Sequence, residues 1–474
     1  MDPASPTQRE RGPGDPGELG GPAGIRNLDA LLANGLRGPR ELALRVAAAG
    51  LAACDPGLAV ERMVALDGDV LVVDGRRHEL KPGGRIVVLG SGKASLKIGY
   101  ALEKVLGDRL SGGTIVVRHG DEAVPLESIE VLEASHPLPD GRSVSCARRL
   151  LDHAVDLGPD DICIACFTGG SSALTSLPPA GVPDADKREL HRVLLASGIS
   201  ITEVNTVRKQ VSAFKGGRLA LAAAPATVIN LTVSDVAGDV LDAITDPSVP
   251  NESTVADALA VLQGHGLWEA VPESIRAHLS DPRLQAPDLS GVTIHSTLVV
   301  TGETACEAMT RAAAEAGAEA IVLSTSLEEE AAPVGRILAG IATESAARGR
   351  PFPSPSVLIG CGGESTVRLG PDDDFGSGGP NQEAALAAGT RLDGAPVAVV
   401  FVDTDGSDGG TDLAGGVADG ATAARAVELG IDLRATLATH RSGAAIAALG
   451  DGIETGPTHT NVNDLFVVAI GEAT

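Results

Sequence analysis

Three segments of this chain share one pattern, in which a short apolar strand runs directly into a glycine-rich turn. Continuous apolar runs of this length are typical of strands that are buried on both faces, and strands that alternate with helical stretches predict parallel α/β sheets. In such sheets ligands bind at the carboxyl ends of the strands. The pattern therefore predicts a binding site built from these turns. The three segments are Ile86–Ser95, Ile162–Ser172 and Val357–Thr366.

The first glycine turn carries a lysine, Lys93, at the start of a predicted helix. Glycine lets a backbone approach an anion closely, and the N-terminus of a helix adds about half a positive charge. The spacing fits neither the P-loop nor the dinucleotide fingerprint, because Ala94 and Ser95 stand where those motifs require Ser/Thr and Gly. The turn thus predicts phosphate binding without fixing the kind of nucleotide.

Two further strands, Val228–Val233 and Val397–Val402, end in acidic loops. Carboxylates on loops suit Mg²⁺, which takes one or two protein oxygens and keeps water and substrate phosphate as its other ligands. Asx turns that cap the next helix are the alternative for Asp408 and Asp412. Phosphate-binding turns and paired aspartates together predict a nucleotide-dependent phosphoryl-transfer site. The predicted metal ligands are Asp235, Asp239, Asp405 and Asp408.

The segment Asn205–Ala220 is basic although the chain as a whole is acidic. On a helix that starts at Asn205 and ends at the Gly216–Gly217 pair, Arg208, Lys209 and Lys215 fall on neighbouring turns and form one basic face. Anion binding explains such a face. A solvated charged face is the alternative.

Composition and length limit the classes of protein to which the chain can belong. The chain has 474 residues, enough for two domains, and a net charge of −26 repels nucleic acid. No apolar run approaches the roughly 18 residues of a membrane span. Pro- and Gly-rich residues 1–25 predict a disordered tail, and a polar, proline-containing stretch predicts a boundary between an N-terminal domain, 26–285, and a C-terminal domain, 292–474.

The six cysteines show no regular spacing, and no secretory signal precedes them, which predicts a reducing cytoplasmic location. Cys163 and Cys166 form a C-x-x-C pair inside a predicted strand. An offset of three on a strand places two side chains on opposite faces. Packing is therefore the better interpretation of these thiols than redox chemistry or zinc binding.

These segments together resemble the class II glycerate kinases, whose C-terminal half is the MOFRL domain. The resemblance spans nearly all of the chain after the tail, in one order. The segments that carry it are Gly90–Ser95, His136–Asp140, Gly169–Leu174, Asn205–Lys209, Lys215–Ala220, Ser234–Val236 with Gly238–Asp239, Gly362–Glu364, Asn381–Glu383, Asp405–Gly409, Thr455–Thr458 and Thr460–Asp464.

The resemblance implies a Rossmann-like, mostly parallel N-terminal sheet with flanking helices, a C-terminal α/β domain and an active site in the cleft between them. It also implies that ATP and Mg²⁺ serve the phosphorylation of D-glycerate to 2-phospho-D-glycerate. Separately, we expect a monomer or a homodimer. Lys93, Asp235 and Arg208 are the expected catalytic residues. The expected nucleotide-binding residues are Gly90, Ser91, Gly92, Gly169, Gly170, Ser171, Ser172, Lys209, Lys215, Gly363, Glu364 and Asn381.

The chain departs from the family pattern at four places. Pro380 replaces an arginine before Asn381, Thr245–Ser248 replaces a Ser-Gly-Pro-Thr turn, His459 replaces a glycine and Ala237 replaces a proline. An arginine fork is the natural partner of a carboxylate or phosphate, so its loss bears on the identity of the hydroxy acid.

Two alternatives remain open. Gly90–Gly92 follows a strand and Arg118–His119 closes the next one, as in an NAD(P)H-dependent hydroxypyruvate reductase. Against that function, the third glycine is missing and no acidic residue ends the second strand. A ligand-binding homologue with weakened catalysis is the other alternative.

Overall fold

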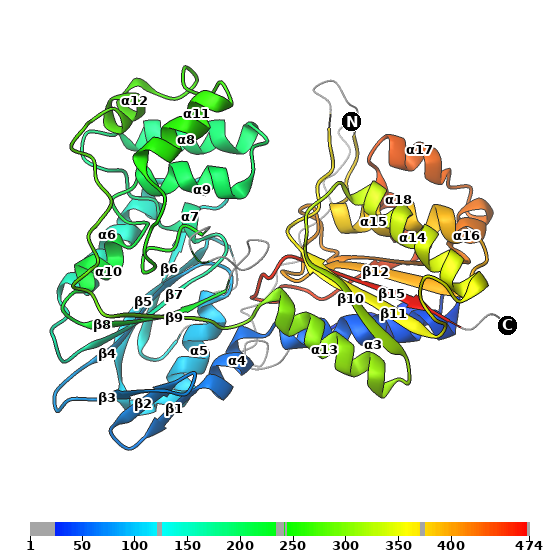
Figure 1. The fold of residues 1–474 in the computed structure, drawn as a ribbon, viewed down its shortest axis with the longest axis horizontal. Coiled ribbons are helices and arrows are strands. Elements are labelled where there is room, and N and C mark those ends of the chain that lie inside the picture. Colours follow the sequence, from blue (N-terminus) through cyan, green and yellow to red (C-terminus); the bar gives the residue numbers. More distant parts are fainter. Residues whose placement is uncertain (1–23, 121–125, 234–240, 242–243, 370–374, 472–474) are drawn as a thin grey trace, which may run out of the picture.

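The computed structural model describes residues 24–120, 126–233, 241, 244–369 and 375–471, and these form two α/β domains (Figure 1). The two domains lie side by side, each built on a six-stranded sheet. The disordered tail predicted for 1–25 falls almost entirely outside the described residues. Asp235, Asp239 and Ala237 lie outside them as well.

The sheet of the first domain is entirely parallel and has the order β6-β5-β4-β7-β8-β9. Along the chain this order is 3-2-1-4-5-6, the order of dinucleotide-binding folds. It reverses between β4 and β7, so the loops after these two strands lie next to each other. The parallel sheet predicted from the apolar runs is confirmed. Its strands are β4 (Ile86–Ser91), β5 (Leu110–Arg118), β6 (Ile129–Ala134), β7 (Ile162–Phe167), β8 (Thr227–Thr232) and β9 (Ile294–Leu298).

Helices cover both faces of this sheet. One face packs on α5 (Ser95–Leu106), and the other on α6 (Gly141–Val155) and α10 (Arg218–Ala223). Cys166 belongs to the apolar cluster on the α5 face and Cys163 to the cluster on the α6 face, which confirms that the pair serves packing. Beside α5 lie α4 (Pro56–Met63) and a three-stranded sheet of β1 (Val64–Asp67), β2 (Val70–Val73) and β3 (Arg76–Glu79).

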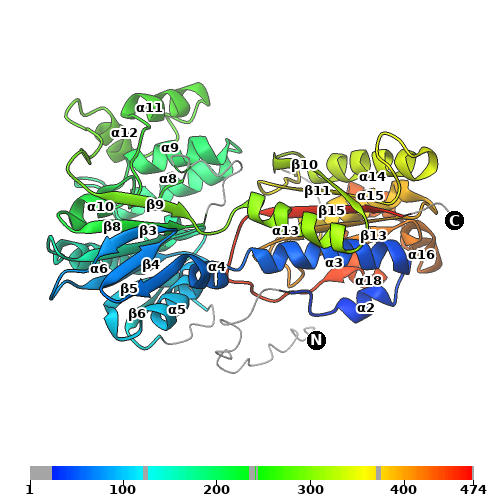
Figure 2. The same ribbon diagram turned by 60° about the horizontal axis from the view of Figure 1, so that its bottom comes forward.

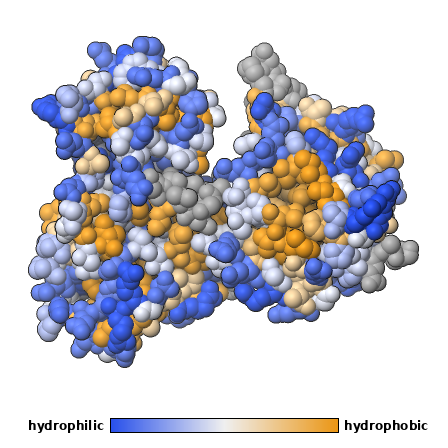
Figure 3. All heavy atoms as spheres, in the orientation of Figure 1, coloured by the Kyte–Doolittle hydropathy of each residue, from blue (hydrophilic) through white to orange (hydrophobic). Residues whose placement is uncertain are grey.

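Four helices form a separate layer at the top of the first domain in Figure 1. They share an apolar cluster of their own, which includes Leu190, Val207, Leu262 and Ile275. The helices are α8 (Asp184–Ala196), α9 (Ile201–Gln210), α11 (Val255–Gly264) and α12 (Glu273–Leu279). In the space-filling view a notch separates this layer from the second domain (Figure 3).

The sheet of the second domain is mixed, with the order β10-β11-β15-β12-β13-β14, and only β10 and β11 run parallel. The prediction of parallel sheets is therefore wrong here. The reason is that β12 returns to β13 through a loop without a crossover helix, and that β15, from the end of the chain, inserts between β11 and β12. The strands are β10 (Glu319–Leu327), β11 (Ser356–Gly362), β12 (Val397–Asp403), β13 (Gly415–Asp419), β14 (Gly452–Ile453) and β15 (Asp464–Ile470).

The domains do not divide where the sequence predicted. Near the N-terminus, α3 (Arg37–Ala53) packs on α13 (Gly302–Glu315) and on the second sheet, and β9 pairs with β8 in the first sheet (Figure 2). Buried Arg40 on α3 fixes this placement through ion pairs with Asp419 and Asp451, the latter at 2.9 Å. The opposite face of the second sheet is covered by α14 (Ala331–Arg348) and α15 (Pro380–Leu392). Hydrophobic periodicity does not say which sheet a helix covers.

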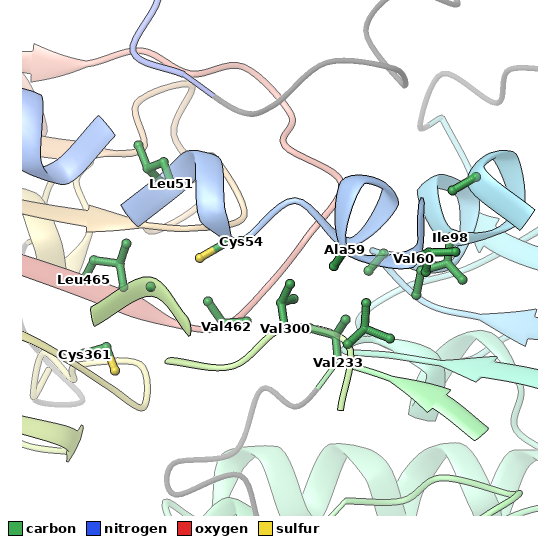
Figure 4. Packing of buried hydrophobic residues seen from close by; sticks show 14 of the residues in the cluster. Leu51, Cys54, Ala59, Val60, Ile98, Val233, Val300, Cys361, Val462 and Leu465 are labelled. Carbon is green, nitrogen blue, oxygen red and sulfur yellow. The ribbon is translucent and has the colours of Figure 1, made fainter. Parts of the chain in front are cut away.

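One continuous apolar cluster joins the domains (Figure 4). Cys54 and Leu465 lie on the side of the second domain, Val60 and Ile98 on the side of the first, and Val300 between them. A buried ion pair of 2.6 Å between Lys97 Nζ and Asp55 Oδ2 lies at the same junction. No single described helix is long and apolar enough to span a membrane. The bent pair of α3 and α4 is long and apolar enough when the two helices are taken together, by length and composition alone.

Candidate active site

The two domains face each other across a cleft that consists of two adjoining cavities of about 880 and 780 Å³. Both cavities are lined by Lys93, His136 and Gly170 from the first domain. Asp405 lines the first cavity and Glu364 the second, both from the second domain. The cleft lies where the strand order of the parallel sheet reverses, which is where ligands bind in such folds.

Lys93 and Asp405 form an ion pair across the cleft, with 2.6 Å between Lys93 Nζ and Asp405 Oδ2. Burial by itself lowers the pKa of Lys93, but the charge of Asp405 outweighs that effect and raises the pKa above its ordinary value. Lys93 is therefore a fixed cation at physiological pH. It comes from the loop after β4, and Asp405 from the loop after β12.

The backbone of the first glycine turn is already engaged by the protein. Lys93 N–H donates to Gly169 O at 2.9 Å, and Ala94 N–H donates to Thr168 Oγ1 at 3.1 Å. A Cβ on Gly92 would lie 2.4 Å from Thr168 Oγ1, so this glycine serves close packing of the two loops. The expectation that Gly90 and Ser91 bind phosphate is corrected, because both are buried residues of β4 and line neither cavity. Gly92 lines the first cavity, but its N–H donates to Val116 O at 3.2 Å, so Lys93 is the residue of this turn that can offer a charge to the cleft.

The second glycine turn is the better candidate for phosphate binding. Gly170, with φ of 84°, precedes α7 (Ser171–Leu174), and its N–H has no acceptor among the described residues. Ser172 Oγ is buried and lacks a hydrogen-bond partner within the described part of the chain. Gly169, Gly170, Ser171 and Ser172 all line the cleft. An oxyanion would satisfy the donors that the fold leaves unpaired here.

Next to Asp405, two buried carboxylates of the second domain, Asp403 and Asp464, lie at the ends of neighbouring strands without lining either cavity. Asp403 and Asp464 are directly paired across the antiparallel strands β12 and β15. Burial, followed by the charges of Asp405, Asp464 and Glu364, raises the pKa of Asp403 well above its usual range. Burial also raises the pKa of Asp464 to about 7. The sequence pointed to the loop after β12, but only the return of β15 brings Asp464 beside it.

Asp408 does not face the cleft. Its Oδ1 and Oδ2 accept hydrogen bonds from the backbone N–H groups of Asn381 and Gln382, at 3.0 and 2.8 Å, at the N-terminus of α15. The predicted metal role of Asp408 is therefore corrected to helix capping. Asn381, expected at the nucleotide, is also buried, and its side chain donates to Asp464 Oδ1 at 2.6 Å.

The basic segment is organised differently from the prediction. The helix starts at Ile201 with a Ser200–Glu203 capping box and ends at Gln210, so Asn205 is not its cap. Lys215 is fully buried and donates to Thr175 O at 3.0 Å, and burial, followed by the charge of Arg208, lowers its pKa to about 7. Lys209 is buried too, and neither lysine lines the cleft. Of the predicted basic face, Arg208 alone lines it.

Two cleft residues were not selected from the sequence. His136, in the His136–Asp140 loop, lines both cavities, and burial, followed by the charges of Lys93, Arg118 and Arg208, lowers its pKa to about 4. It is a neutral imidazole at physiological pH. His459 lines the first cavity with φ of 54°, a left-handed conformation that glycine adopts more readily than other residues. In the sequence, His136 belongs to a segment that carries the family resemblance, and His459 is a departure from the family pattern.

The first domain has the strand order of dinucleotide-binding folds, and its hydrogen-bond donors lie where that order reverses. They face carboxylates of the second domain across the cleft. This arrangement defines a two-domain α/β phosphotransferase. Residues 42–280 match a domain family described as of unknown function (DUF4147), and residues 357–464 match the MOFRL family. The chain belongs to the glycerate kinase family whose C-terminal part is the MOFRL domain.

Named relatives cover almost the full chain. A glycerate 2-kinase of Pyrococcus horikoshii is 38% identical over 91% of this chain and 97% of that protein. A putative hydroxypyruvate reductase of Agrobacterium vitis is 40% identical over 91% of this chain and 94% of that protein. The crystal structure of a glycerate kinase from Thermotoga maritima, 35% identical, superposes with a TM-score of 0.77 over 91% of this chain and 99% of that one.

Proposed function

We propose that this protein phosphorylates D-glycerate with ATP to form 2-phospho-D-glycerate. The observation that carries the proposal is the Lys93–Asp405 pair at the meeting point of the two cavities. A fixed cation at that point can hold the phosphoryl group while it passes from a donor to an acceptor. The names of the P. horikoshii and T. maritima relatives support glycerate as the acceptor.

The residues of the first domain suit the phosphates of ATP. Gly170 N–H and Ser172 Oγ are donors without acceptors among the described residues, and Lys93 lies close to them at the cleft. Positioning and charge stabilisation carry most of the catalysis in phosphoryl transfer, because the protein does little covalent chemistry. Loss of one such preorganised charge costs about 10² to 10³ in turnover.

The residues of the second domain fit one metal ion. No set of three or more His, Cys, Asp or Glu side chains in the described ranges can hold a metal alone. Mg²⁺ needs only one or two protein oxygens in addition to phosphate and water. Asp405, which lines the first cavity, would hold it, together with Asp403, which ends β12, accepts a hydrogen bond from Asp405 N–H at 2.8 Å and is crowded by like charges. When bound, Mg²⁺ would neutralise the developing charge of the phosphates.

Arg208 and His136 complete the proposed acceptor side. Arg208 lines the same cavity as Lys93 and can pair with the carboxylate of glycerate through two parallel hydrogen bonds. His136 remains neutral, so it can accept a hydrogen bond from a substrate hydroxyl without repelling Lys93. Asp235 stays the predicted acceptor of the hydroxyl proton, and Asp239 a further predicted metal ligand; both lie outside the described residues. We place the enzyme in the cytoplasm, as a monomer or homodimer.

Hydroxypyruvate reduction is the second candidate, favoured by the name of the A. vitis relative. The first glycine turn argues against it, because the pyrophosphate of NAD(P)H binds backbone N–H groups that are here bonded to Thr168 and Gly169. A catalytically weakened homologue is the third candidate, because Pro380 stands where the family pattern has an arginine; against it, Pro380 begins α15 outside the lining of both cavities.

One experiment separates the three. Pure protein is incubated with ATP, Mg²⁺ and D-glycerate, and the product is identified by ³¹P NMR; a parallel reaction contains NADPH and hydroxypyruvate. We expect 2-phospho-D-glycerate and no oxidation of NADPH. Oxidation of NADPH without phosphoryl transfer would establish the reductase, and inactivity in both reactions the weakened homologue. The matched control for Lys93→Ala is Lys104→Ala, which removes a lysine from the exposed side of α5.

A further inference from the structure

A third pocket, of about 540 Å³, lies on the second domain beside the cleft. Four arginines from four segments line it: Arg336 on α14, Arg391 on α15, Arg434 on α17 (Leu433–Ala438), and Arg368 in the chain that follows β11. All four side chains are exposed to solvent. Four guanidinium groups in one pocket stand out in a chain with a net charge of −26.

The carboxylates of the pocket match only part of this charge. Glu330 Oε1 pairs with Arg368 Nε at 3.1 Å, and Glu383 pairs with His440 Nδ1 at 3.0 Å. Arg336, Arg391 and Arg434 form no ion pair or hydrogen bond with the side chain of any described residue. With histidine counted as neutral, the four arginines and two glutamates give this concave surface a net charge of +2, and three of its guanidinium groups have no side-chain partner among the described residues. Such a surface attracts anions of matching charge.

We propose that this arginine pocket binds a small anion that carries both a phosphate monoester and a carboxylate. A phosphate monoester dianion and a carboxylate together bear about three negative charges, so such a molecule offers an anionic group to each of the three arginines that lack a side-chain partner and exceeds the net charge of +2 on the lining. Guanidinium forks bind phosphate and carboxylate oxygens through two parallel hydrogen bonds each. The volume lies within the range of about 300 to 1,000 Å³ that small-molecule sites occupy.

The location of the pocket connects it to the proposed reaction. Glu330, Pro333, Thr366 and Arg368 line both the arginine pocket and the smaller, 780 Å³ cavity of the cleft. Helix α15 carries Arg391 at its end, and at its start Asn381, which bonds to Asp464 beside Asp403. A product of glycerate phosphorylation has both anionic groups that the pocket selects. Such a molecule can therefore bind here without occupying the position of Lys93.

Binding can be measured without turnover, so the test does not depend on the proposed function. Isothermal titration with 2-phospho-D-glycerate uses Lys93→Ala protein, in which the cleft has lost its central cation. We expect this protein to retain a binding site that Arg391→Ala/Arg434→Ala weakens at least tenfold. Arg311→Ala/Arg348→Ala, two exposed arginines outside the pocket, is the charge-matched control and should leave the affinity unchanged.

A second ligand tests the chemical class. Glycerol 2-phosphate lacks the carboxylate and should bind at least tenfold more weakly than 2-phospho-D-glycerate. Because the four arginines are exposed, the variants should keep their melting temperature, and Arg391→Gln/Arg434→Gln provides a second pair if the alanine pair does not fold. Affinity unchanged by the pocket variants would overturn the site, and equal affinity for the two ligands would overturn its selectivity.

Discussion

The two sides of the cleft differ in charge and in origin. The first domain contributes donors and a cation, Lys93, from loops at the ends of parallel strands. The second contributes Asp405, from the loop after β12, with Asp403 and Asp464 buried at the paired ends of antiparallel strands. One side suits the phosphates of a nucleotide, and the other suits a metal ion and a proton acceptor. Neither side is a phosphotransferase site by itself. The junction that holds the domains together, with its Lys97–Asp55 ion pair, is therefore as necessary as the residues in the cleft.

The largest expected effect comes from removing the cation of the first side. We expect Lys93→Ala to fold normally and to lose about two to three orders of magnitude in kcat, the cost of one preorganised charge at a transition state. Steady-state kinetics with ATP and D-glycerate measure it, and Lys104→Ala should keep full activity. A Lys93→Ala enzyme that retains a third of the turnover would place the site elsewhere.

The matching change on the second side is Asp405→Asn. The amide keeps the shape but removes the charge that pairs with Lys93 and would hold Mg²⁺, so kcat should fall by roughly a hundredfold and half-saturation should require more Mg²⁺. Titration of activity against Mg²⁺ checks this. Asp412→Asn, in the same loop and cavity, is the control. An unchanged Mg²⁺ requirement in Asp405→Asn would confine Asp405 to orienting Lys93.

The neutral histidine predicts a pH effect on stability. The pKa of His136 falls from 6.5 to about 4 on folding, because of burial first and then the cations around it. Its contribution to stability is complete above pH 6.5 and is lost as the pH falls toward 4, where the unfolded chain binds the proton and the folded chain does not. Between pH 7 and pH 5, wild type should lose about 2 kcal/mol more than His136→Gln in urea unfolding. If the free energy of unfolding falls equally in the two proteins over this pH range, His136 is not buried among these charges.

The smallest expected effect tests the missing arginine. Pro380 is the first residue of α15 and lines neither cavity, while Arg208 lines the cleft. We therefore expect Pro380→Arg to change kcat/KM for D-glycerate by less than about threefold, which is under 0.7 kcal/mol. A tenfold gain would show instead that an arginine fork at this helix start reaches the substrate. Longer hydroxy acids, assayed in parallel, show whether the substrate preference moves.

Patterns in the sequence predicted the first domain well and the second only in part. Buried apolar runs such as Ile162–Phe167 indicated parallel strands, and their glycine turns placed Lys93 and Gly170 at one edge of the sheet. They did not reveal that N–H groups of the first turn donate hydrogen bonds to residues of the second turn. The two turns have the same sequence pattern, a strand followed by glycines, and the pattern does not distinguish their roles. In the second domain the same patterns did not reveal that β15 runs antiparallel between β11 and β12.

The positions of the predicted cations and carboxylates show that local sequence patterns do not predict burial or hydrogen-bond partners. Lys215 and Asp408 were selected because of their residue type and the glycines around them, yet one is buried against a carbonyl and the other caps α15. Burial and partner choice depend on what packs above a side chain, and the packing element can come from hundreds of residues away.

The sequence by itself determined the strands, the glycine turns and the family of this protein, because residue order fixes periodicity and backbone freedom. Tertiary structure alone decided which cations keep their charge, which carboxylates crowd together, and which N–H groups stay free. Those properties depend on distance, burial and neighbours, and folding sets all three. The same holds for the arginine pocket, whose four side chains lie between residues 336 and 434 and meet only after α14, α15 and α17 have packed.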